Sequence, residues 1–571
     1  MLHAKGTLLT IDVGEREART TDIGDVLSSF VGGRGAATKL AHDRTPFDAD
    51  PLGPENRLYF TTGPLQHSRM SFTGRMNATA ISPLTDGIRS TNAGGFLSRN
   101  FAATGHAAVE LVGESEELLA VHITDGADEQ RSSGSETASR PRVEFEEVPD
   151  LEDALVSETS EYVEQTRGLG AEHLVTAGPA GENLVRYASI MTSDTRAFGR
   201  GGLGAVMGAK GVKCVSFDGD SEPDVEIPDV QTEVHRDAAQ SDDPMKRQGT
   251  TGGTEFINDE FSLPTRYFSE QSFEDVADIG GDAVEEKKYK RGTCSQCAFG
   301  CKLPTRDEET DLETEGPEFE TVMSFGSCAG VGDIVDVMKS NDLCDELGLD
   351  TISAGVTVSA YLASEDEFGN AELIHDLLPK IAHREGVGDL LAEGVERCHD
   401  ELGVENWSSK GLEFAAHDGR AINGQGLSYA TSNSGADHMY SEILSAEYSG
   451  KLDPEGLDGK AEFLVQSENA AAFKDSGVVC AFSSDYATED RLAALFDADY
   501  DDLLAVGARV VELERHFNNR RGFDRSDDDL PYELPSFESA LDDYYDARGW
   551  NDDGTVPESR ISGGEGAVGA D

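Results

Sequence analysis

Residues 292–304 read GTCSQCAFGCKLP and bring three of the chain's eight cysteines within eight positions. Cys294, Cys297 and Cys301 form the pattern CxxCxxxC, and no histidine lies near them in the sequence. Thiolate-only spacing of this kind is typical of a [4Fe–4S] cluster, which takes four cysteine ligands. The fourth ligand must therefore come from elsewhere in the chain.

Cys480, in the segment DSGVVC, is the best candidate for that ligand because it follows a predicted helix at a loop. The spacing alone leaves two other uses of the cysteines open. One is a tetrahedral zinc site completed by a distant cysteine or histidine, and the other is a CxxC redox dithiol. The other cysteines lie in apolar or helical contexts, and we expect buried thiols at Cys214, Cys328, Cys344 and Cys398.

The region before these cysteines is rich in glycine and carries the alternating, β-branched pattern of strands as far as about residue 210. The clearest predicted strands are 7–13, 57–62, 107–113, 118–124 and 172–178. Turns are expected at 31–37, 82–87 and 92–95, a solvated loop at 125–142, and a frayed tail at 561–571.

Apolar residues recur every three to four positions after about residue 213, which predicts helices. The predicted helices are 333–347, 371–383, 388–402, 461–473 and 501–517. A β-rich front followed by a helical body predicts an α+β multidomain protein, with a β-rich N-terminal domain and two mainly α-helical domains. We expect these domains at residues 1–212, 213–414 and 415–571.

Acidic residues dominate the composition, with 110 Asp and Glu against 47 Lys and Arg and a net charge of −63. Because the acids are scattered along the chain, we expect a whole surface adapted to molar salt in a halophilic organism, where screening weakens self-repulsion. Nucleic acid is an unfavourable partner for such a surface. No signal peptide or membrane-spanning run is recognised, so a cytoplasmic protein is expected.

Two segments share one shape, an acidic residue at a helix end, a turn with glycine, and an acid or thiol five positions on. We call residues 345–350 (DELGLD) the first acid loop and residues 475–480 (DSGVVC) the second acid loop. Two like loops suggest two copies of one ligand about a pseudo-twofold axis, although two ordinary helix ends would look the same. The string GRGGLG at 199–204 matches GxGxxG but lacks a βαβ context, so a dinucleotide site is not predicted.

Ten strings along the chain, taken together, indicate one protein family because they occur in the order found in that family. They are VGGRG (31–35), TGPL (62–65), TGRMNATAISPLTDGIRSTNAGG (73–95), AGPAGENLVRYA (177–188), GRGGLGAVMG (199–208), CSQCAFGC (294–301), EGPEFET (315–321), NDLCDELGLDTIS (341–353), YATSNSGADH (429–438) and DSGVVC (475–480). In this combination the chain resembles the aldehyde:ferredoxin oxidoreductase family, tungsten enzymes with a bis-pterin cofactor and one [4Fe–4S] cluster.

The resemblance implies a set of site residues. The cluster ligands would be Cys294, Cys297, Cys301 and Cys480, and Arg75 would bridge cluster and pterin. One pterin would be held by Asp345, Leu349 and Asp350, and the other by Asp475, Val479 and Cys480. Backbone carbonyls of Asn92 and Ala180 would reach a Mg²⁺ between the pterin phosphates, and further cofactor contacts are expected at Gly94, Gly95, Gly181 and Arg200.

Beside the metal, the resemblance implies two polar side chains, Glu320 in GPEFET and His438 in GADH. A carboxylate in a closed, mostly apolar pocket is a competent base for water, and a histidine opposite can donate to a carbonyl oxygen. Three positions depart from the family pattern, namely Phe319, where tyrosine is expected, Tyr440, where a lysine can occur, and Val478, in place of a turn glycine. No pair of metal-bridging residues follows GPEFET, so a dimer-linking iron is not predicted.

We therefore expect an enzyme that oxidises an aldehyde to its carboxylate with ferredoxin as the acceptor. Tungsten and molybdenum both stay open, as do the identity of the aldehyde and a homodimer. A first rival keeps the cofactor and reduces a carboxylic acid or an aromatic thioester. A second rival, from another class, is a zinc-stabilised binding protein without redox function.

Overall fold

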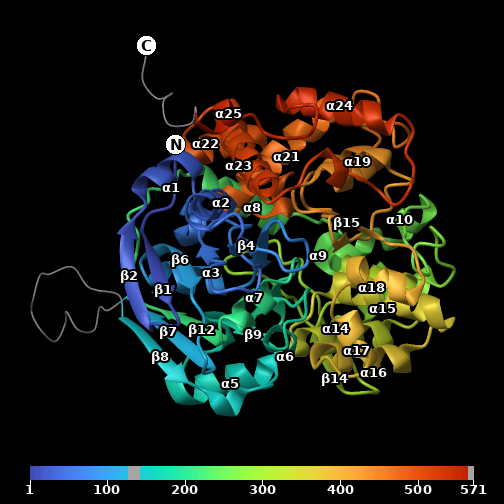
Figure 1. The fold of residues 1–571 in the computed structure, drawn as a ribbon, viewed down its shortest axis with the longest axis horizontal. Coiled ribbons are helices and arrows are strands. Elements are labelled where there is room, and N and C mark those ends of the chain that lie inside the picture. Colours follow the sequence, from blue (N-terminus) through green and yellow to red (C-terminus); the bar gives the residue numbers. More distant parts are fainter. Residues whose placement is uncertain (126–141, 563–571) are drawn as a thin grey trace, which may run out of the picture.

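The N-terminal part of the chain forms two six-stranded sheets, drawn in blue to green in Figure 1. This computed structural model describes residues 1–125 and 142–562. The first sheet has the order β2 (Glu17–Asp22), β1 (Thr7–Asp12), β6 (His106–Val112), β3 (Leu58–Thr61), β4 (Arg75–Ile81) and β5 (Ile88–Gly94). The second has the order β11 (Arg196–Phe198), β10 (Ile190–Thr192), β9 (Leu174–Ala177), β12 (Val212–Asp218), β7 (Leu119–Thr124) and β8 (Arg142–Glu147).

The two sheets pack face to face around one hydrophobic core. Each sheet contains one parallel pair, β1 with β6 and β12 with β7, and its other neighbours are antiparallel. Across the core, the Phe60 ring lies 5.8 Å from the Phe198 ring and 6.4 Å from the Phe217 ring. Helix α2 (Gly33–Arg44) covers the outer face of the first sheet, where Ala37 and Leu40 pack with Tyr59. Buried strands with bulky inward side chains thus produce a sandwich.

Short helices connect the strands of the two sheets. They are α1 (Gly24–Phe30), α3 (Leu97–Ala103), α5 (Val156–Arg167), α6 (Pro179–Glu182) and α7 (Leu203–Ala209).

A mainly helical body follows the sheets, drawn in green to red in Figure 1. Its first half contains α8 (Val230–Gln240), α9 (Met245–Gln248), α10 (Thr254–Asp259), α11 (Val276–Ile279), α12 (Gly281–Lys287), β13 (Pro304–Asp307), β14 (Leu312–Glu315), α13 (Phe319–Val322), α14 (Ile334–Leu347), α15 (Thr351–Glu365), α16 (Ala371–Ala382), α17 (Val387–Leu391) and α18 (Val395–Leu402). Its second half contains β15 (Ser408–Ser409), β16 (Leu412–Glu413), α19 (Asn423–Thr431), α20 (Ile443–Tyr448), α21 (Lys460–Gly477), α22 (Glu489–Phe496), α23 (Tyr500–Arg520), α24 (Phe537–Arg548) and α25 (Glu558–Ser562).

The α+β class and the order of a β-rich front before helices are confirmed, and the five predicted strands are present within one or two residues of their predicted bounds. The boundaries at 212/213 and 414/415 stay predictions; β12 lies across the first of them. Most of the predicted loop at 125–142 and of the predicted tail lies outside the described residues. All four cysteines expected in apolar contexts are buried.

Three local predictions are wrong. The turn expected at 31–37 is instead the start of α2, because Gly32 and Gly33 adopt positive φ and turn the chain directly into a packed helix. The turn expected at 92–95 belongs to β5 as far as Gly94. The helix expected at 388–402 is two helices, because Gly394, at φ +82°, breaks it.

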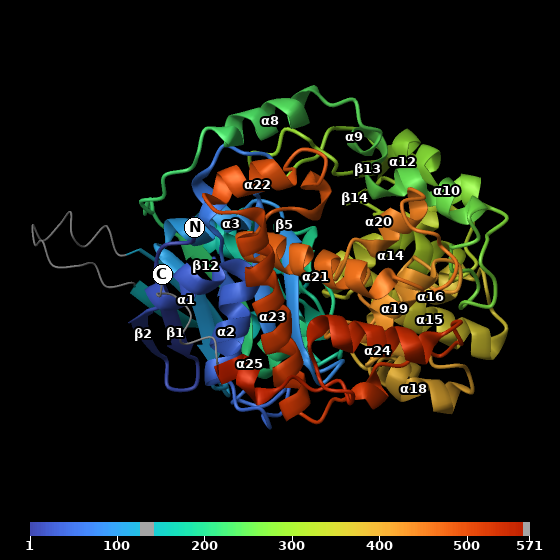
Figure 2. The same ribbon diagram turned by 90° about the horizontal axis from the view of Figure 1, so that it is seen from above.

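Helix α23 connects the C-terminal part of the helical body to the N-terminal domain. It packs against α2 and α21, and Figure 2 shows the three helices side by side. The buried face of α23 carries charged and polar side chains, among them Glu514 and Arg515, so it must find partners in the interior.

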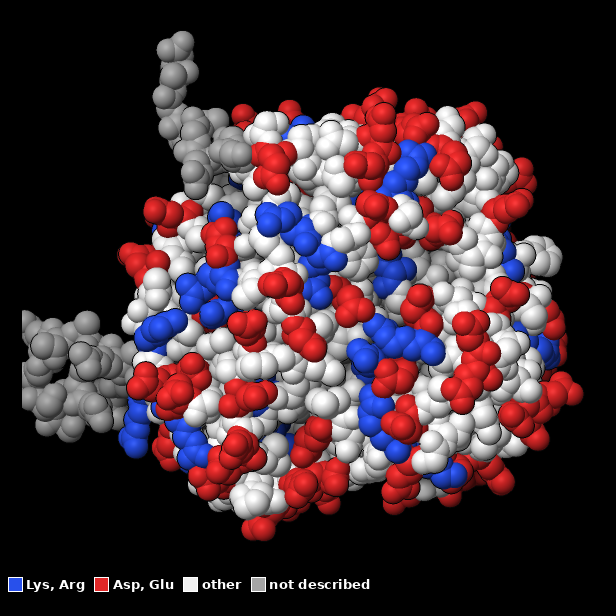
Figure 3. Space-filling model, viewed as in Figure 1, with Lys and Arg blue, Asp and Glu red and all other residues white. Residues whose placement is uncertain are grey.

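Acidic side chains are spread over the face of the molecule in Figure 3, with smaller basic groups between them. None of the helices in the described residues is both long and apolar enough to cross a lipid bilayer.

Candidate functional site

The four predicted cluster cysteines lie on two segments that meet near Phe72. The backbone N–H of Cys480 donates to the Phe72 carbonyl over 2.8 Å, and the backbone N–H groups of Phe72, Phe299 and Gly300 point at the Cys297 sulfur. Cys480 is close enough to Cys297 and Cys301 to interact electrostatically with both. The structure therefore brings the distant cysteine to the three that are close in sequence.

Arg75, at the start of β4, lies beside this cysteine group. Its guanidinium donates to the Cys480 sulfur at 3.6 Å and to the Asn92 carbonyl at 3.3 Å, and it also interacts electrostatically with Cys294. Strand β5 backs the group so closely that a Cβ added to Gly94 would lie 3.1 Å from the Cys294 sulfur. The neighbouring Gly95 has φ +119°, and its carbonyl accepts a bond from Ser295. These residues fix the cysteines against one edge of the first sheet.

The first acid loop joins α14 to α15 and packs on the second sheet's connections. Gly348 makes the turn at φ +74°, and Asp350 then caps α15 by accepting from the backbone of Ile352 and Ser353. Leu349 forms a bridge with Ala188, and a Cβ on Gly178 would lie 2.5 Å from the Leu347 carbonyl.

Arg200 connects the first acid loop to the rest of the predicted site. Its guanidinium lies 3.5 Å from the Asp350 carboxylate and donates to the carbonyls of Glu413 and Ala436. Gly181 packs so tightly on α7 that an added Cβ would lie 2.8 Å from the Gly204 carbonyl. The Asn92 and Ala180 carbonyls already accept from Arg75 and from the backbone of Val185. Each keeps a second lone pair, and a shared Mg²⁺ stays a prediction.

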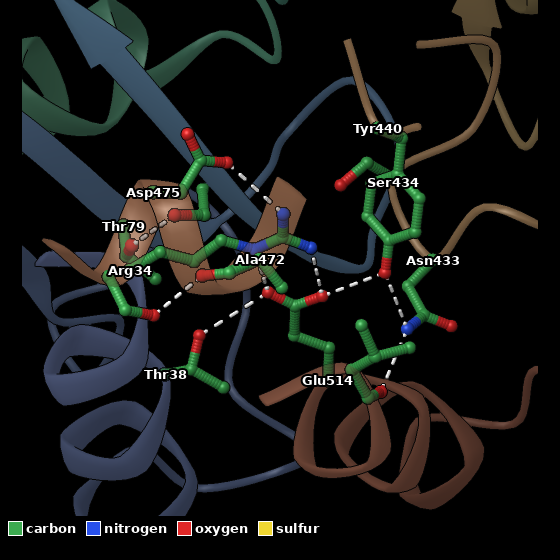
Figure 4. Close-up of polar contacts among 12 residues, drawn as sticks. Arg34, Thr38, Thr79, Asn433, Ser434, Tyr440, Ala472, Asp475 and Glu514 are labelled. Carbon is green, nitrogen blue, oxygen red and sulfur yellow. Dashed lines mark hydrogen bonds and ion pairs between the residues drawn. The ribbon is translucent and has the colours of Figure 1, made fainter. Parts of the chain in front are cut away.

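The second acid loop is held by a buried ion network, shown in Figure 4. Arg34 of α2 donates to Asp475 at 3.2 Å and makes two bonds, of 2.7 and 2.8 Å, to Glu514 of α23. Tyr440 donates to Glu514 at 2.9 Å, and its ring lies 4.7 Å from the Arg34 guanidinium. Asn92 donates to the other Asp475 oxygen at 2.6 Å. Four other chain segments, which carry Arg34, Asn92, Tyr440 and Glu514, are therefore tied together at this loop.

Asp475 is partly accessible although protein surrounds it. Its side chain keeps 29% accessibility, yet burial, opposed by Arg34, raises the pKa of its carboxyl. Asp345 is similar, since it is half-buried while burial and Asp342 raise the pKa of its carboxyl well above the usual range.

Glu320 and His438 come together as the sequence predicts, although 118 positions separate them (438 − 320). The His438 Nε2 lies 3.2 Å from the Glu320 Oε1, and the backbone N–H of Ala416 donates to the other carboxylate oxygen over 2.9 Å. The Nδ1 of His438 is buried and has no hydrogen-bond partner. The Glu320 Oε1 also has no hydrogen-bond partner, so this pair retains two unsatisfied buried polar atoms.

His417 is a site residue that sequence reasoning missed. Its Nε2 lies 3.8 Å from the Glu320 carboxylate and its Nδ1 lies 3.2 Å from the Tyr448 hydroxyl, which contacts Ser262. Burial, followed by the neighbouring His438, lowers the pKa of His417 to about 3, so its ring is neutral at ordinary pH. Phe319 packs its ring 5.4 Å from this histidine. The segment AAHDGR around His417 carries no motif that would have identified it.

The donor set fits an iron–sulfur cluster and a polar cofactor. No three His, Cys, Asp or Glu side chains within residues 1–125 and 142–562 converge closely enough for one metal ion. Zinc needs its donors at one point, whereas each iron of a [4Fe–4S] cluster takes one cysteine, so the four sulfurs can stand apart. Near the acid loops, the Nε atoms of Arg196 and Arg200 and the Ser193 hydroxyl are buried without hydrogen-bond partners, which suits a bound polar group.

Comparisons with known proteins agree with this geometry. A family model described as "Aldehyde ferredoxin oxidoreductase, N-terminal domain" matches residues 8–219, and another described as "Aldehyde ferredoxin oxidoreductase, domains 2 & 3" matches residues 228–562. The chain is 32% identical to the tungsten-containing aldehyde ferredoxin oxidoreductase of Thermococcus kodakarensis and 31% identical to that of Pyrococcus furiosus. Each alignment covers 97% of this chain and 98% of the relative.

A third relative and a solved structure are more distant. The WOR-like subunit of an aliphatic sulfonate oxidoreductase from Pyrococcus furiosus is 26% identical over 98% of this chain and 96% of its own. The BamBC active-site complex of benzoyl coenzyme A reductase superposes with a TM-score of 0.81 at 22% identity, over 99% of this chain and 97% of that one, which shows a shared fold. By its family models and its relatives, the chain belongs to the aldehyde ferredoxin oxidoreductase family of oxidoreductases.

Proposed function

We propose that this protein oxidises an aldehyde to the carboxylic acid and passes the electrons to a ferredoxin, using a tungsten bis-pterin centre and one [4Fe–4S] cluster. The position of Cys480 carries the proposal. Within the six residues of the second acid loop, Cys480 lies beside Arg75 and Asp475 lies beside Arg34. A proposed cluster ligand and a proposed cofactor contact therefore belong to one loop. The tungsten-containing relatives support tungsten as the metal.

The overall reaction sets what the chain's residues must do. Aldehyde and water give acid, two protons and two electrons, so a base must take a proton from water near the carbonyl carbon. When bound, the tungsten pterin centre would accept the electron pair and the cluster would pass single electrons to ferredoxin. In our proposal Cys294, Cys297, Cys301 and Cys480 hold the cluster, and the two acid loops hold the pterins.

Glu320 is the proposed base. Its carboxylate is oriented by the Ala416 N–H, it lies 3.2 Å from His438 and 3.8 Å from His417, and its side chain is 16% exposed. His438 is the proposed donor to the aldehyde oxygen, since its ring already faces the carboxylate. His417 is neutral and touches both Glu320 and Tyr448, so we propose it as a positioning residue.

The first experiment is metal quantification combined with low-temperature EPR of the reduced protein. About four iron atoms and one tungsten atom per chain are expected. Zinc alone would overturn the cofactor assignment, and molybdenum in place of tungsten would change the metal while leaving the protein ligands as proposed.

Glu320→Gln tests the base. General base catalysis contributes about 10²–10⁴-fold, so kcat should fall by that range while iron and tungsten contents stay unchanged. Activity close to that of the parent enzyme would exclude Glu320 as the base.

A substrate panel tests the direction. Aldehydes with oxidised ferredoxin should turn over faster than carboxylic acids or aromatic thioesters with reduced ferredoxin. A faster reductive reaction would favour the alternative use of the same centre.

Adaptation to molar salt, a cytoplasmic location and a homodimer stay predictions. The acid-rich composition supports the first, because screening lets 110 acidic residues coexist on one fold. Dialysis into dilute buffer should lower activity and thermal stability, and unchanged activity there would contradict this expectation.

A further inference from the structure

Five basic residues gather beside the cysteine-rich segment. Lys246, Arg247, Lys288, Lys290 and Arg291, which we call the basic patch, line a shallow depression of about 480 Å³ together with Glu285 and Tyr289. Basic residues therefore outnumber acidic ones by five to one around this depression, whereas the whole chain has 110 acidic and 47 basic residues. The patch comes from α9 and from the segment after α12, and Figure 2 shows these helices side by side at one edge of the molecule.

Most charges of the basic patch are not neutralised by carboxylates. Lys246 donates to the main-chain carbonyls of residues 238, 239 and 241, and Lys288 donates to those of residues 246 and 247. Lys290 is exposed and lies 5.0 Å from the Tyr289 ring. Within the described chain, Arg247 alone among the five forms an ion pair, with Glu285. Carbonyls fix the lysines in place without cancelling their charge, so the depression stays positive.

The basic patch adjoins the segment that carries three of the four proposed cluster ligands. Arg291 donates to the carbonyls of Ala298 and Phe299, which lie between Cys297 and Cys301. The Lys246 ammonium lies 5.9 Å from the Phe299 ring, and Lys288 is near enough to Cys301 to interact with it electrostatically. In this segment Gln296 is exposed, and the cysteines themselves are partly accessible.

We propose that the basic patch is the docking surface for an acidic iron–sulfur electron carrier. The inference rests on the proposed function, because it needs a cluster at the four cysteines and a protein acceptor. Electron transfer between clusters weakens steeply with distance, so the carrier must dock where the cluster ligands approach the surface. A positive patch on an otherwise acidic protein steers a negative partner to that place and away from the rest of the surface.

Direct binding is the first test. The holoenzyme and recombinant ferredoxin from the same organism are mixed, and Kd is measured over a range of salt concentrations at which the enzyme stays folded. The double variant Lys290→Glu/Arg247→Glu should raise Kd at least about tenfold, which corresponds to about 1.4 kcal/mol. The matched control Arg19→Glu reverses an exposed charge on β2, which lies far from α9 and α12 in Figure 2, and should leave Kd unchanged.

Two further measurements separate docking from catalysis. Aldehyde oxidation with a small artificial dye should be the same in the double variant and the parent enzyme, while the ferredoxin-linked rate falls. Zero-length carbodiimide cross-linking should join Lys290 to a ferredoxin carboxylate. If the dye-linked reaction is absent from the parent enzyme, the proposed function fails, whereas the binding result still decides on the docking surface.

Several results would overturn the docking proposal. One is an unchanged Kd in the double variant, and another is an equal loss in Arg19→Glu. A third is a cross-link map that places ferredoxin away from α9 and residues 288–291. A fourth is sedimentation showing that the double variant instead separates a dimer, because the patch would then bind a second copy of this chain.

Discussion

The two acid loops have nearly the same backbone but reach it with different residues. In the first, Gly348 sits at φ +74° and ψ 45°, and in the second, Val478 sits at φ +54° and ψ 43°. Glycine adopts this left-handed conformation freely, whereas it strains a β-branched residue by about 1–3 kcal/mol. The Val478 side chain compensates by packing on α2 and the segment after β3, 2.8 Å from where a Cβ of Gly33 or Gly63 would lie. Tertiary packing therefore maintains the loop shape where the residue type opposes it.

The loops also differ in how their carboxyl groups are paired. Asp475 accepts from Arg34 and Asn92, and the same arginine is held by Glu514. Asp345 accepts from Asn341 at 3.2 Å, and its nearest charged neighbours include Asp342. The second loop is thus fixed by ions before any cofactor binds, while the first presents a carboxyl in acidic surroundings. The two loops, which we propose hold the pterins, therefore have unequal electrostatics at equivalent positions.

The largest expected difference between the loops is iron binding, because only the second loop carries a proposed cluster ligand. Cys480→Ala should lower iron content and reduce ferredoxin-linked activity by more than about 100-fold, since even indirect ligand contacts are worth 10–100-fold in metal affinity. Cys344→Ala, at the buried thiol beside Asp345 in the first loop's helix, is the matched control and should keep its iron. Metal analysis measures the iron content of both variants, and equal iron contents would exclude Cys480 as a cluster ligand.

The next largest effect concerns the arginine of each loop. Arg34→Ala leaves the buried Glu514 carboxylate without its charged partner and should destabilise the fold by about 3–5 kcal/mol, seen as a large fall in Tm. Arg200→Ala removes a contact of 3.5 Å to Asp350 and the bonds to the Glu413 and Ala436 carbonyls, but it leaves no buried charge without its ion-pair partner at short range. Asp350 keeps its bonds to the α15 backbone, so a loss of about 1–3 kcal/mol is expected. Equal shifts in Tm for the two variants would show that the ion network does not distinguish the loops.

The elements of this site differ in how far the sequence could predict them. Cys294, Cys297 and Cys301 form a local pattern, so their common role is visible in the sequence. Cys480 was a candidate from its place in a loop after a predicted helix, while Glu320 and His438 needed the family resemblance. The Arg34 network was invisible because its contact with Glu514 joins residues 480 positions apart. The glycines at 32 and 33 suggested a turn because their role as the tight start of a helix depends on distant contacts. Gly32 packs against Thr62 and Gly63, and Gly33 packs against the second acid loop.

A glycine–valine exchange between the loops tests the packing argument. Gly348→Val forces a β-branched residue to positive φ with its Cβ 3.0 Å from the Gly178 nitrogen, so a loss of about 2–4 kcal/mol is expected. Val478→Gly relieves strain but loses a buried side chain and gains chain entropy, so a loss of about 0–2 kcal/mol follows. Thermal melting of both variants measures this, and a larger loss in Val478→Gly would mean that burial outweighs backbone conformation.

The smallest expected effect is the pH dependence of the first loop's helix. Burial, then Glu346, raises the pKa of Asp342 to about 6, whereas an unfolded aspartate titrates near about 3.9. The folded protein therefore binds this proton more tightly, and the stability it confers is present below about pH 4 and lost as pH rises to about 6.

Asp342→Asn removes that loss of stability. The variant should be more stable than the parent above pH 6 by about 1–2 kcal/mol, after allowing for solvent screening of a half-buried group, and equal to it near about pH 4. The second loop has buried Ala472 at the corresponding position, three residues before its aspartate, so no such effect arises there.

Glu346→Gln, which retains a partner for Ser157, should reproduce part of the gain in stability because it removes the charge beside Asp342. Melting curves of the three proteins between pH 4 and 7 decide the matter, since a gap between parent and Asp342→Asn that does not change with pH would mean that this carboxyl does not titrate above its unfolded range.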